Sequence, residues 1–148
     1  MSPRRVVTAQ RVIAAPPERI FDLLADPRQH PRLDGSGTVR AVRRAPSRLS
    51  LGATFAMGMR IGLPYVTSNR VVAFEEGRVI AWHHPARFIW RYDLEPVAEG
   101  TLVTESFDYS PPWGSLIERL GWPERNRQAM EATLERLARA VGEPTSDD

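Results

Sequence analysis

Residues 88–94 read Phe-Ile-Trp-Arg-Tyr-Asp-Leu, so that every second residue is large and apolar. Successive side chains of a β-strand point to opposite faces, and this alternation therefore predicts a strand with one bulky apolar face. Residues 55–61 repeat the pattern with Phe55, Met57, Met59 and Ile61. From 37 to 109 the period stays at two, with hairpin signals at Glu76-Gly77, Pro85 and Glu99-Gly100. The sequence therefore predicts a meander of antiparallel strands.

The segment before this meander predicts one strand and two short helical pieces. Residues 6–14 are β-prone and end at Pro16-Pro17, where a proline suits the first turn of a helix. Ile20, Phe21 and Leu24 give that helix an apolar face, and Asp26-Pro27 ends it. Residues 30–35 form a second short helical turn or a loop.

After Pro111-Pro112 the apolar period becomes helical. A first segment carries Leu116, Ile117 and Leu120, and a second carries Met130, Leu134, Leu137 and Val141 along one face. Gly121 and Pro123 interrupt the path between the two segments, and Gly142 with Pro144 ends the second. The order predicts an α+β fold in which a curved antiparallel sheet of about six or seven strands wraps around a long C-terminal helix.

Composition limits the classes of function. The 148 residues are 42% hydrophobic and 26% charged, which predicts one globular domain over 1–148 with a flexible tail at 142–148. There is no cysteine, and all 20 basic residues are Arg, which excludes thiolate and Lys-based chemistry. The net charge of +2 is not typical of a nucleic-acid-binding protein. No apolar run reaches the ~20 residues needed for membrane insertion, so a cytoplasmic location follows by default.

The element order and several motifs resemble the START-like polyketide cyclase/dehydrase superfamily, also called SRPBCC. The motifs are IAAPPERIF at 13–21, ADP at 25–27, FEEG at 74–77, WRYDLEP at 90–96 and GTLVT at 100–104. The resemblance implies a helix-grip fold with a deep cavity between the sheet and the C-terminal helix. Members include lipid carriers, hormone receptors and aromatases, so the fold alone implies no single function.

Two-residue turns at Glu76-Gly77 and Pro85-Ala86, with an even-numbered loop at Glu99-Gly100, predict which residues face this cavity. The predicted inner face then has three rows across four strands. They are Arg70, His83, Phe88 and Tyr109; then Val72, Ala81, Trp90 and Phe107; then Phe74, Val79, Tyr92 and Glu105.

Two polar ends of this face are candidate catalytic or binding sites. Arg70, His83 and Tyr109 would bind a carboxylate, phenol or enolate and exchange protons; alternatively, Arg70 extends along the sheet edge and His83 caps a turn. Glu105 would be a buried carboxyl with a raised pKa, or an exposed one if a bulge reverses the strand. His83 and Glu105 lie roughly 13 Å apart along the strands, too far for one dyad. Only one of His83 and His84 can face the cavity.

The predicted ligand-binding residues form an aromatic and methionine-rich surface. They are Met57, Met59, Val72, Trp90, Tyr92 and Phe107. The alternative is that these side chains are ordinary core. No spacing for a metal, phosphate or cofactor site is present. The sequence therefore favours a binding protein for a small hydrophobic molecule, with an aromatase/cyclase or dehydrase as the second hypothesis and an interaction module with a vestigial cavity as the third.

Overall fold

The computed structural model describes residues 5–142, in which seven strands form one antiparallel sheet. Their order across the sheet is β1-β7-β6-β5-β4-β3-β2, so only β1 lies beside a strand distant in sequence. The elements are β1 Val6–Ile13, α1 Pro17–Ala25, η1 Pro27–Gln29, α2 His30–Leu33, β2 Val39–Arg44, β3 Thr54–Ile61, β4 Leu63–Glu75, β5 Val79–His83, β6 Ile89–Val97, β7 Gly100–Asp108, α3 Gly114–Arg119 and α4 Trp122–Gly142.

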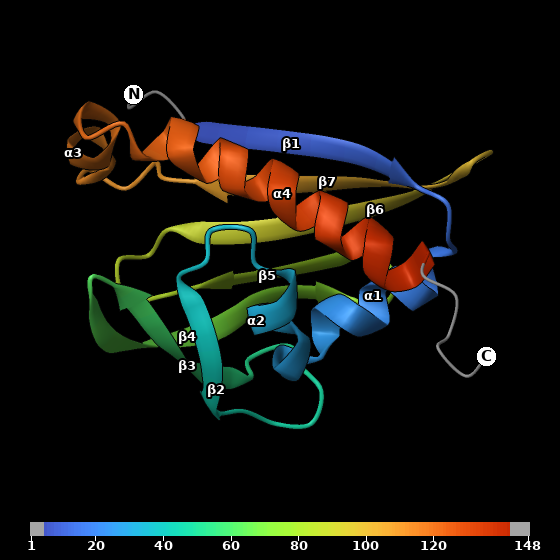
Figure 1. Cartoon of the computed structure of the whole chain (residues 1–148), viewed down its shortest axis with the longest axis horizontal. Helices are drawn as coiled ribbons and strands as arrows, with labels where there is room; N and C mark the ends of the chain where they lie inside the picture. Colours follow the sequence, from blue (N-terminus) through green and yellow to red (C-terminus); the bar gives the residue numbers. More distant parts are fainter. Residues whose placement is uncertain (1–4, 143–148) are drawn as a thin grey trace.

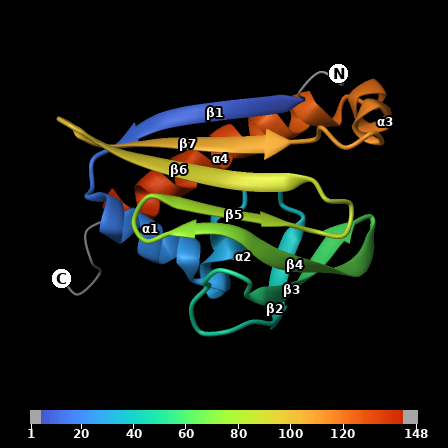
Figure 2. The same cartoon turned by 180° about the vertical axis from the view of Figure 1, so that it is seen from behind.

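The helices cover one face of the sheet. Figure 1 shows α4 running diagonally in front of β1, β7 and β6, with α1 and α2 beside it. Seen from behind, the strands lie in front and their outer face is bare (Figure 2). The predicted helix-grip architecture, including the short helices after the first strand, is confirmed.

The first helices begin and end where the prolines predict. Pro17 occupies the first turn of α1, where its missing N–H costs no hydrogen bond. The Asp26 side chain accepts a hydrogen bond from the Arg28 N–H at 3.0 Å and so caps η1. Ile20, Phe21 and Leu24 are 0–2% exposed, and they attach α1 to the core.

The C-terminal helices are separated at the predicted position. Gly121 has a φ of +76°, a conformation that favours glycine, and α4 begins immediately after it with Pro123 in its first turn. The predicted apolar stripe of α4 is buried at Met130, Leu134, Leu137 and Val141. Within residues 5–142 no helix is long and apolar enough to cross a membrane. The predicted tail lies beyond the described residues, apart from Gly142.

Candidate functional site

The β6–β7 pairing creates the inner surface that the sequence predicts. Trp90 lies opposite Phe107, and Tyr92 lies opposite Glu105. The hairpin closes with Val97 opposite Gly100, which gives the even-numbered loop that the register requires. This part of the predicted face is therefore confirmed.

The register of β5 differs from the prediction by one residue. Three residues, not two, separate Glu75 from its partner Val79, and Gly77 takes a φ of +77° within that turn. The next turn places His83 opposite Ile89, with Arg87 at a φ of +65°. Because a shift of one residue exchanges the faces of a strand, Ile80 and Trp82 face inward in place of Val79 and Ala81.

A bulge in β4 produces a second correction. Val71 pairs with Trp82 and Ala73 with Ala81, so Val72 is the extra residue between them. Val71 is 1% exposed, whereas Val72 is 40% exposed and points away from the core. Val72 is therefore not part of the inner surface.

The predicted polar end of Arg70, His83 and Tyr109 does not form. Arg70 does pair with His83, as predicted, but the pair lies on the outer face, because their neighbours Asn69 and Trp82 point inward. Tyr109 is inside, stacked on Phe107 with the ring centroids 5.7 Å apart. The ring of His84 lies 5.9 Å from that of Phe88, so His84 is the inward histidine.

The inner surface carries two groups of packed aromatic rings, which adjoin where Trp82 and Trp90 pair across β5 and β6. Trp90 and Phe107 approach to 4.5 Å between centroids, and Trp82 contacts Tyr92 at 5.8 Å. On the opposite side, β3 contributes Phe55, whose ring meets Trp82 edge-on at 5.7 Å. These geometries are typical of favourable ring packing. We call this set the aromatic band; its members are Phe55, Trp82, Phe88, Trp90, Tyr92, Phe107 and Tyr109.

His30 joins this band, although sequence reasoning assigned it no role. Its ring stacks on Trp82 at 5.0 Å, and its Nε2 hydrogen-bonds with the Leu24 carbonyl at 2.8 Å. Burial lowers the pKa of His30, so the ring is neutral. The only signal in the sequence was the short helical turn at His30-Pro31, and a turn does not reveal which way its side chain points.

Glu105 is the polar group inside this surface. It is 3% exposed, and its Oε1 has no hydrogen-bond partner within residues 5–142. Burial raises the pKa of Glu105 to about 8; the charge of Asp34 adds to this effect, and a hydrogen bond with Tyr92 opposes it. The carboxyl is therefore mostly protonated at neutral pH and can donate a hydrogen bond. The expectation that Glu105 points inward is confirmed.

The loop after α2 closes this interior against α4. The Gly35 N–H donates to Thr133 Oγ1 at 2.8 Å, and Arg136 donates to the Asp34 carbonyl. A Cβ on Gly35 would lie 2.4 Å from the Ala129 carbonyl oxygen, so only glycine allows this approach. The turn at 34–37 is therefore part of the packing between α2 and α4.

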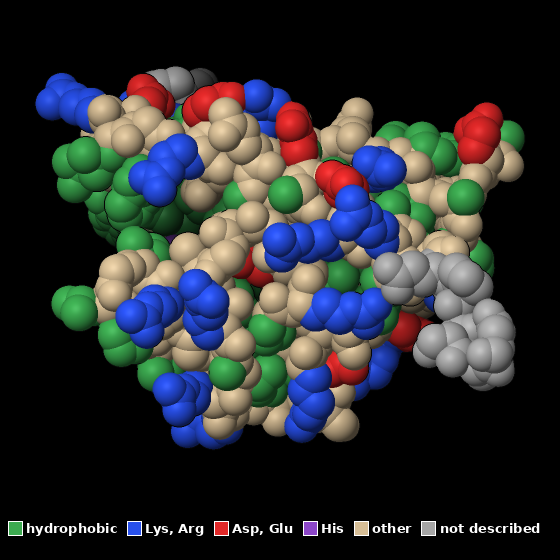
Figure 3. All heavy atoms as spheres, viewed as in Figure 1, with side chains coloured by type: hydrophobic (Ala, Val, Ile, Leu, Met, Phe, Trp, Pro, Cys, Tyr) green, Lys and Arg blue, Asp and Glu red, His purple; other side chains and the backbone are tan. Residues whose placement is uncertain are grey.

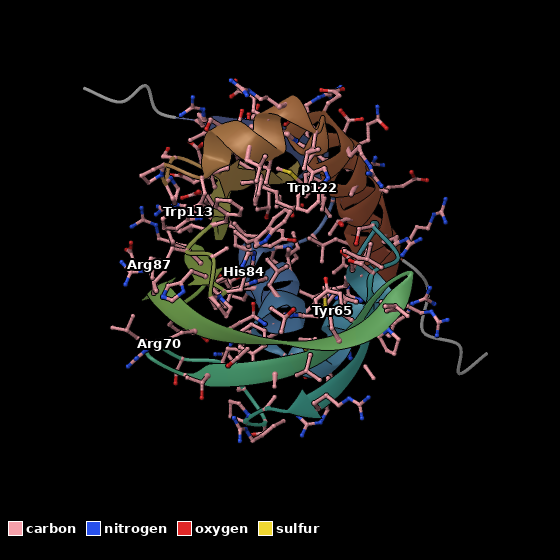
Figure 4. The ribbon with its side chains drawn as sticks, turned by 90° about the vertical axis from the view of Figure 1, so that its left-hand side faces the viewer. Tyr65, Arg70, His84, Arg87, Trp113 and Trp122 are labelled. Carbon is pink, nitrogen blue, oxygen red and sulfur yellow. The ribbon has the colours of Figure 1, made fainter. Side chains whose placement is uncertain are left out.

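At the opposite end of the molecule, inner-face side chains keep contact with solvent. Figure 4 looks at this end, with the curved strands below, α3 and α4 above, and Tyr65, His84 and Trp122 around the space between them. Trp90 and Met59 are only half-buried although they belong to the inner face. We call this region the open end; it comprises the β3–β4 tip at 61–66, the β5–β6 loop at 84–88 and the segment 113–122.

Two grooves lie on the outside of the molecule. One, of about 530 Å³, runs between β1 and α4 past Gln10, Arg11 and Glu135. The other, of about 200 Å³, lies between α1 and the Gly77 turn. None of the predicted ligand-binding residues lines either groove. Within residues 5–142, no three His, Asp or Glu side chains are grouped to hold a metal ion.

The sheet wrapped around α4 makes this a helix-grip protein, and solved structures share that fold. Protein CV1439 from Chromobacterium violaceum matches with a TM-score of 0.72 at 20% identity, covering 95% of this chain and 99% of that one. The AHSA1-like protein from Aeromonas hydrophila matches with a TM-score of 0.69 at 15% identity, covering 97% and 99%. Residues 4–142 match the family described as polyketide cyclase / dehydrase and lipid transport, and the chain belongs to that family.

A curated relative shares more sequence. The uncharacterised protein Rv0088 of Mycobacterium tuberculosis is 38% identical over 133 residues, which are 85% of this chain and 59% of the relative. The chain therefore spans less than two thirds of the relative's length.

Proposed function

We propose that this protein binds a small hydrophobic or aromatic ligand against the aromatic band. The observation that carries the proposal is the partial exposure of Trp90 and Met59 on a largely buried inner face. Inward side chains that keep contact with solvent at the open end offer a ligand apolar surface to cover. Such a ligand would lie against Trp90 and Phe107, with the flexible side chains of Met57 and Met59 opposite it.

Glu105 would give this surface its polar contact. Because the carboxyl is protonated at neutral pH, its free oxygen can exchange a hydrogen bond with a ligand hydroxyl or carbonyl. Glu105 lies two residues along β7 from Phe107, about 7 Å deeper than the Trp90 row. This arrangement favours a ligand with an apolar body and one buried oxygen.

A titration with 2-naphthol, followed by tryptophan fluorescence, tests the proposal. We expect saturable binding that Trp90→Ala weakens about tenfold or more, since a stacking wall is lost. Met59→Ala, a milder change in the same surface, would weaken it less. Val72→Ala is the matched control, because the Val72 side chain points outward. This variant should bind 2-naphthol with unchanged affinity. Absence of saturable binding, or equal affinity in all three variants, would contradict the proposal and favour an interaction module.

A second candidate function is an aromatase/cyclase or dehydrase reaction. Its support is the pairing of a protonated carboxyl, Glu105, with the Tyr92 hydroxyl in a buried site, an arrangement suited to proton transfer. Arg70 and His83 lie on the outer face and are not part of this proposal, while Tyr109 belongs to the inner surface. Incubation with a poly-β-ketone probe, followed by mass spectrometry for loss of water, distinguishes turnover from binding. Turnover that Glu105→Gln abolishes while binding persists would establish the enzyme.

A further inference from the structure

The open end carries large apolar side chains in contact with solvent. Leu63 is 78% exposed, Ile61 61% and Leu116 60%. Figures 1 and 2 both place the β3–β4 tip and α3 at the same end of the molecule. Figure 3 shows hydrophobic side chains gathered at that left-hand edge, above and below a recess. The exposed apolar residues there are Ile61, Leu63, Tyr65, Val66, Trp113, Leu116, Leu120 and Trp122.

These side chains are held in place by contacts behind them. The Trp113 indole donates a hydrogen bond to the Ala86 carbonyl at 2.6 Å, which joins α3 to the β5–β6 loop. Arg5 pairs with Glu118 at 3.0 Å and attaches α3 to the start of β1. On the other side, Gly62 at a φ of +73° lets Ile61 pair with Leu63 at the hairpin tip. The apolar exposure is therefore built into two fixed walls of the opening.

Unpaired arginines lie on these segments or directly beside them. Arg60, Arg87 and Arg119 are exposed, and within residues 5–142 none of them has a carboxylate partner. Figure 4 shows Arg70 and Arg87 reaching outward beside the opening. Some arginines elsewhere, such as Arg48 and Arg127, are paired with acidic residues. The strand β2 arginines Arg40 and Arg44 are exposed like those of the open end, but among the described residues no comparable group of exposed apolar side chains lies beside them. Exposed Trp and Leu next to free positive charge is the pattern of a protein that binds a lipid interface.

We infer that the open end docks onto an anionic lipid surface. The inference rests on the proposed function: a docked opening would let an apolar ligand pass between the bilayer and the aromatic band without crossing water. Docking would seat the side chains of Leu63, Leu116 and Trp122 at the headgroup boundary and leave the helices outside the hydrocarbon. Arg60, Arg87 and Arg119 would face the acidic headgroups.

A second copy of this chain fits the same surface less well. A two-fold interface places each patch against itself, so the unpaired arginines of both copies would meet. The apolar side chains also stand on separate segments around a recess, whereas a stable interface needs a continuous complementary core. A bilayer accepts separated apolar tips without such complementarity.

Co-sedimentation with vesicles tests the inference. We expect binding to phosphatidylcholine vesicles that contain phosphatidylglycerol, weaker binding to phosphatidylcholine alone, and loss of binding as salt rises. The double variant Leu63→Ser/Leu116→Ser should bind at least about tenfold more weakly. Leu51→Ser is the matched control, because Leu51 is 67% exposed but lies in the loop between β2 and β3. Arg87→Gln/Arg119→Gln should weaken binding to the anionic vesicles alone.

Several outcomes would overturn docking. Absence of vesicle binding by the wild-type chain would do so, as would equal binding by the double leucine variant. A dimer in sedimentation velocity that the same variant dissociates would assign the surface to a second copy instead. The 2-naphthol titration in buffer separates the two proposals, because the leucine variant should keep its affinity there. The experiments can therefore contradict docking while supporting ligand binding, or contradict ligand binding while supporting docking.

Discussion

Leu137 and Leu116 lie on consecutive helices, but one is 0% exposed and the other 60%. Leu137 belongs to a packed end in which α1 and the last turns of α4 close against the sheet, together with Phe21, Leu24 and Val141. Leu116 belongs to the open end. Both regions use the same residue types. The difference shows that apolar residues have two roles in this chain: they stabilise the core at the packed end, and they form exposed surface at the open end.

The two ends are also built differently. At the packed end, side chains from α1, α4 and several strands converge on one core. At the open end, one hydrogen bond, one ion pair and a close backbone contact hold the segment 113–122 from behind, which leaves its apolar side chains free. We therefore expect substitutions at the packed end to act on folding and substitutions at the open end to act on function.

The largest expected effect is a loss of stability at the packed end. Leu137→Ala should lower the free energy of unfolding by about 2–5 kcal/mol, because it leaves a cavity under α4. Leu116→Ala, the same change at the open end, should shift it by less than about 0.5 kcal/mol. Urea unfolding followed by circular dichroism measures both. Similar losses in the two variants would mean that the open end is part of the core after all.

The second effect is a dependence of stability on pH that Glu105 should impose. Its pKa is about 8 in the folded protein against an ordinary value of 4.5, so the native state retains a proton that the unfolded chain releases. The contribution of Glu105 to stability should therefore be greatest below the ordinary value and fall by up to roughly 1.4 kcal/mol per pH unit until the pH reaches the folded pKa.

Glu105→Gln cannot titrate and should remove this slope. Urea unfolding at several pH values through that range measures the difference between the variant and the wild-type chain. Glu95→Gln, which changes an exposed strand carboxylate, should keep the wild-type slope. An unchanged slope in the Glu105 variant would show that the carboxyl is already ionised in the native state.

How far the sequence predicts this surface depends on the turns between strands. The even-numbered loop before Gly100 kept the predicted register of β6 and β7, and so placed Trp90, Tyr92, Phe107 and Glu105 correctly. The period-two and helical patterns likewise gave the fold, because both report directly which faces are buried.

The errors have two physical causes. Residue Gly77 sits in a three-residue turn, and Arg87 takes a left-handed conformation that a non-glycine residue rarely adopts, so the lengths of these two loops could not be inferred. The bulge at Val72 also changed which residues of β4 point inward, so that Val71 and not Val72 faces the core. A bulge is a mismatch between two paired strands, so the sequence of one strand alone does not reveal it.

A smaller effect is expected where α3 meets β7. A Cβ on Gly114 would lie 1.8 Å from the Tyr109 carbonyl oxygen, so Gly114→Ala must push α3 away from the strand. We expect a loss of about 1–3 kcal/mol, with faster amide exchange over residues 113–122. Ser115→Ala, one residue along, should leave both quantities nearly unchanged. Exchange that increased throughout the chain would show that this contact supports the whole fold.

The smallest expected effect concerns the hydrogen bond that spans the open end. Trp113→Phe keeps an apolar ring and removes only the indole N–H, which donates to the Ala86 carbonyl. Because the bond is exposed, its loss should lower the free energy of unfolding by no more than about 0.5–1.5 kcal/mol. Amide exchange in the 84–88 loop should nevertheless become faster. Trp122→Phe is the matched control, since within residues 5–142 its indole has no hydrogen-bond partner. If both variants behaved alike, the ring of Trp113 and not its hydrogen bond would position the loop. The open end would then depend on apolar packing, as the packed end does.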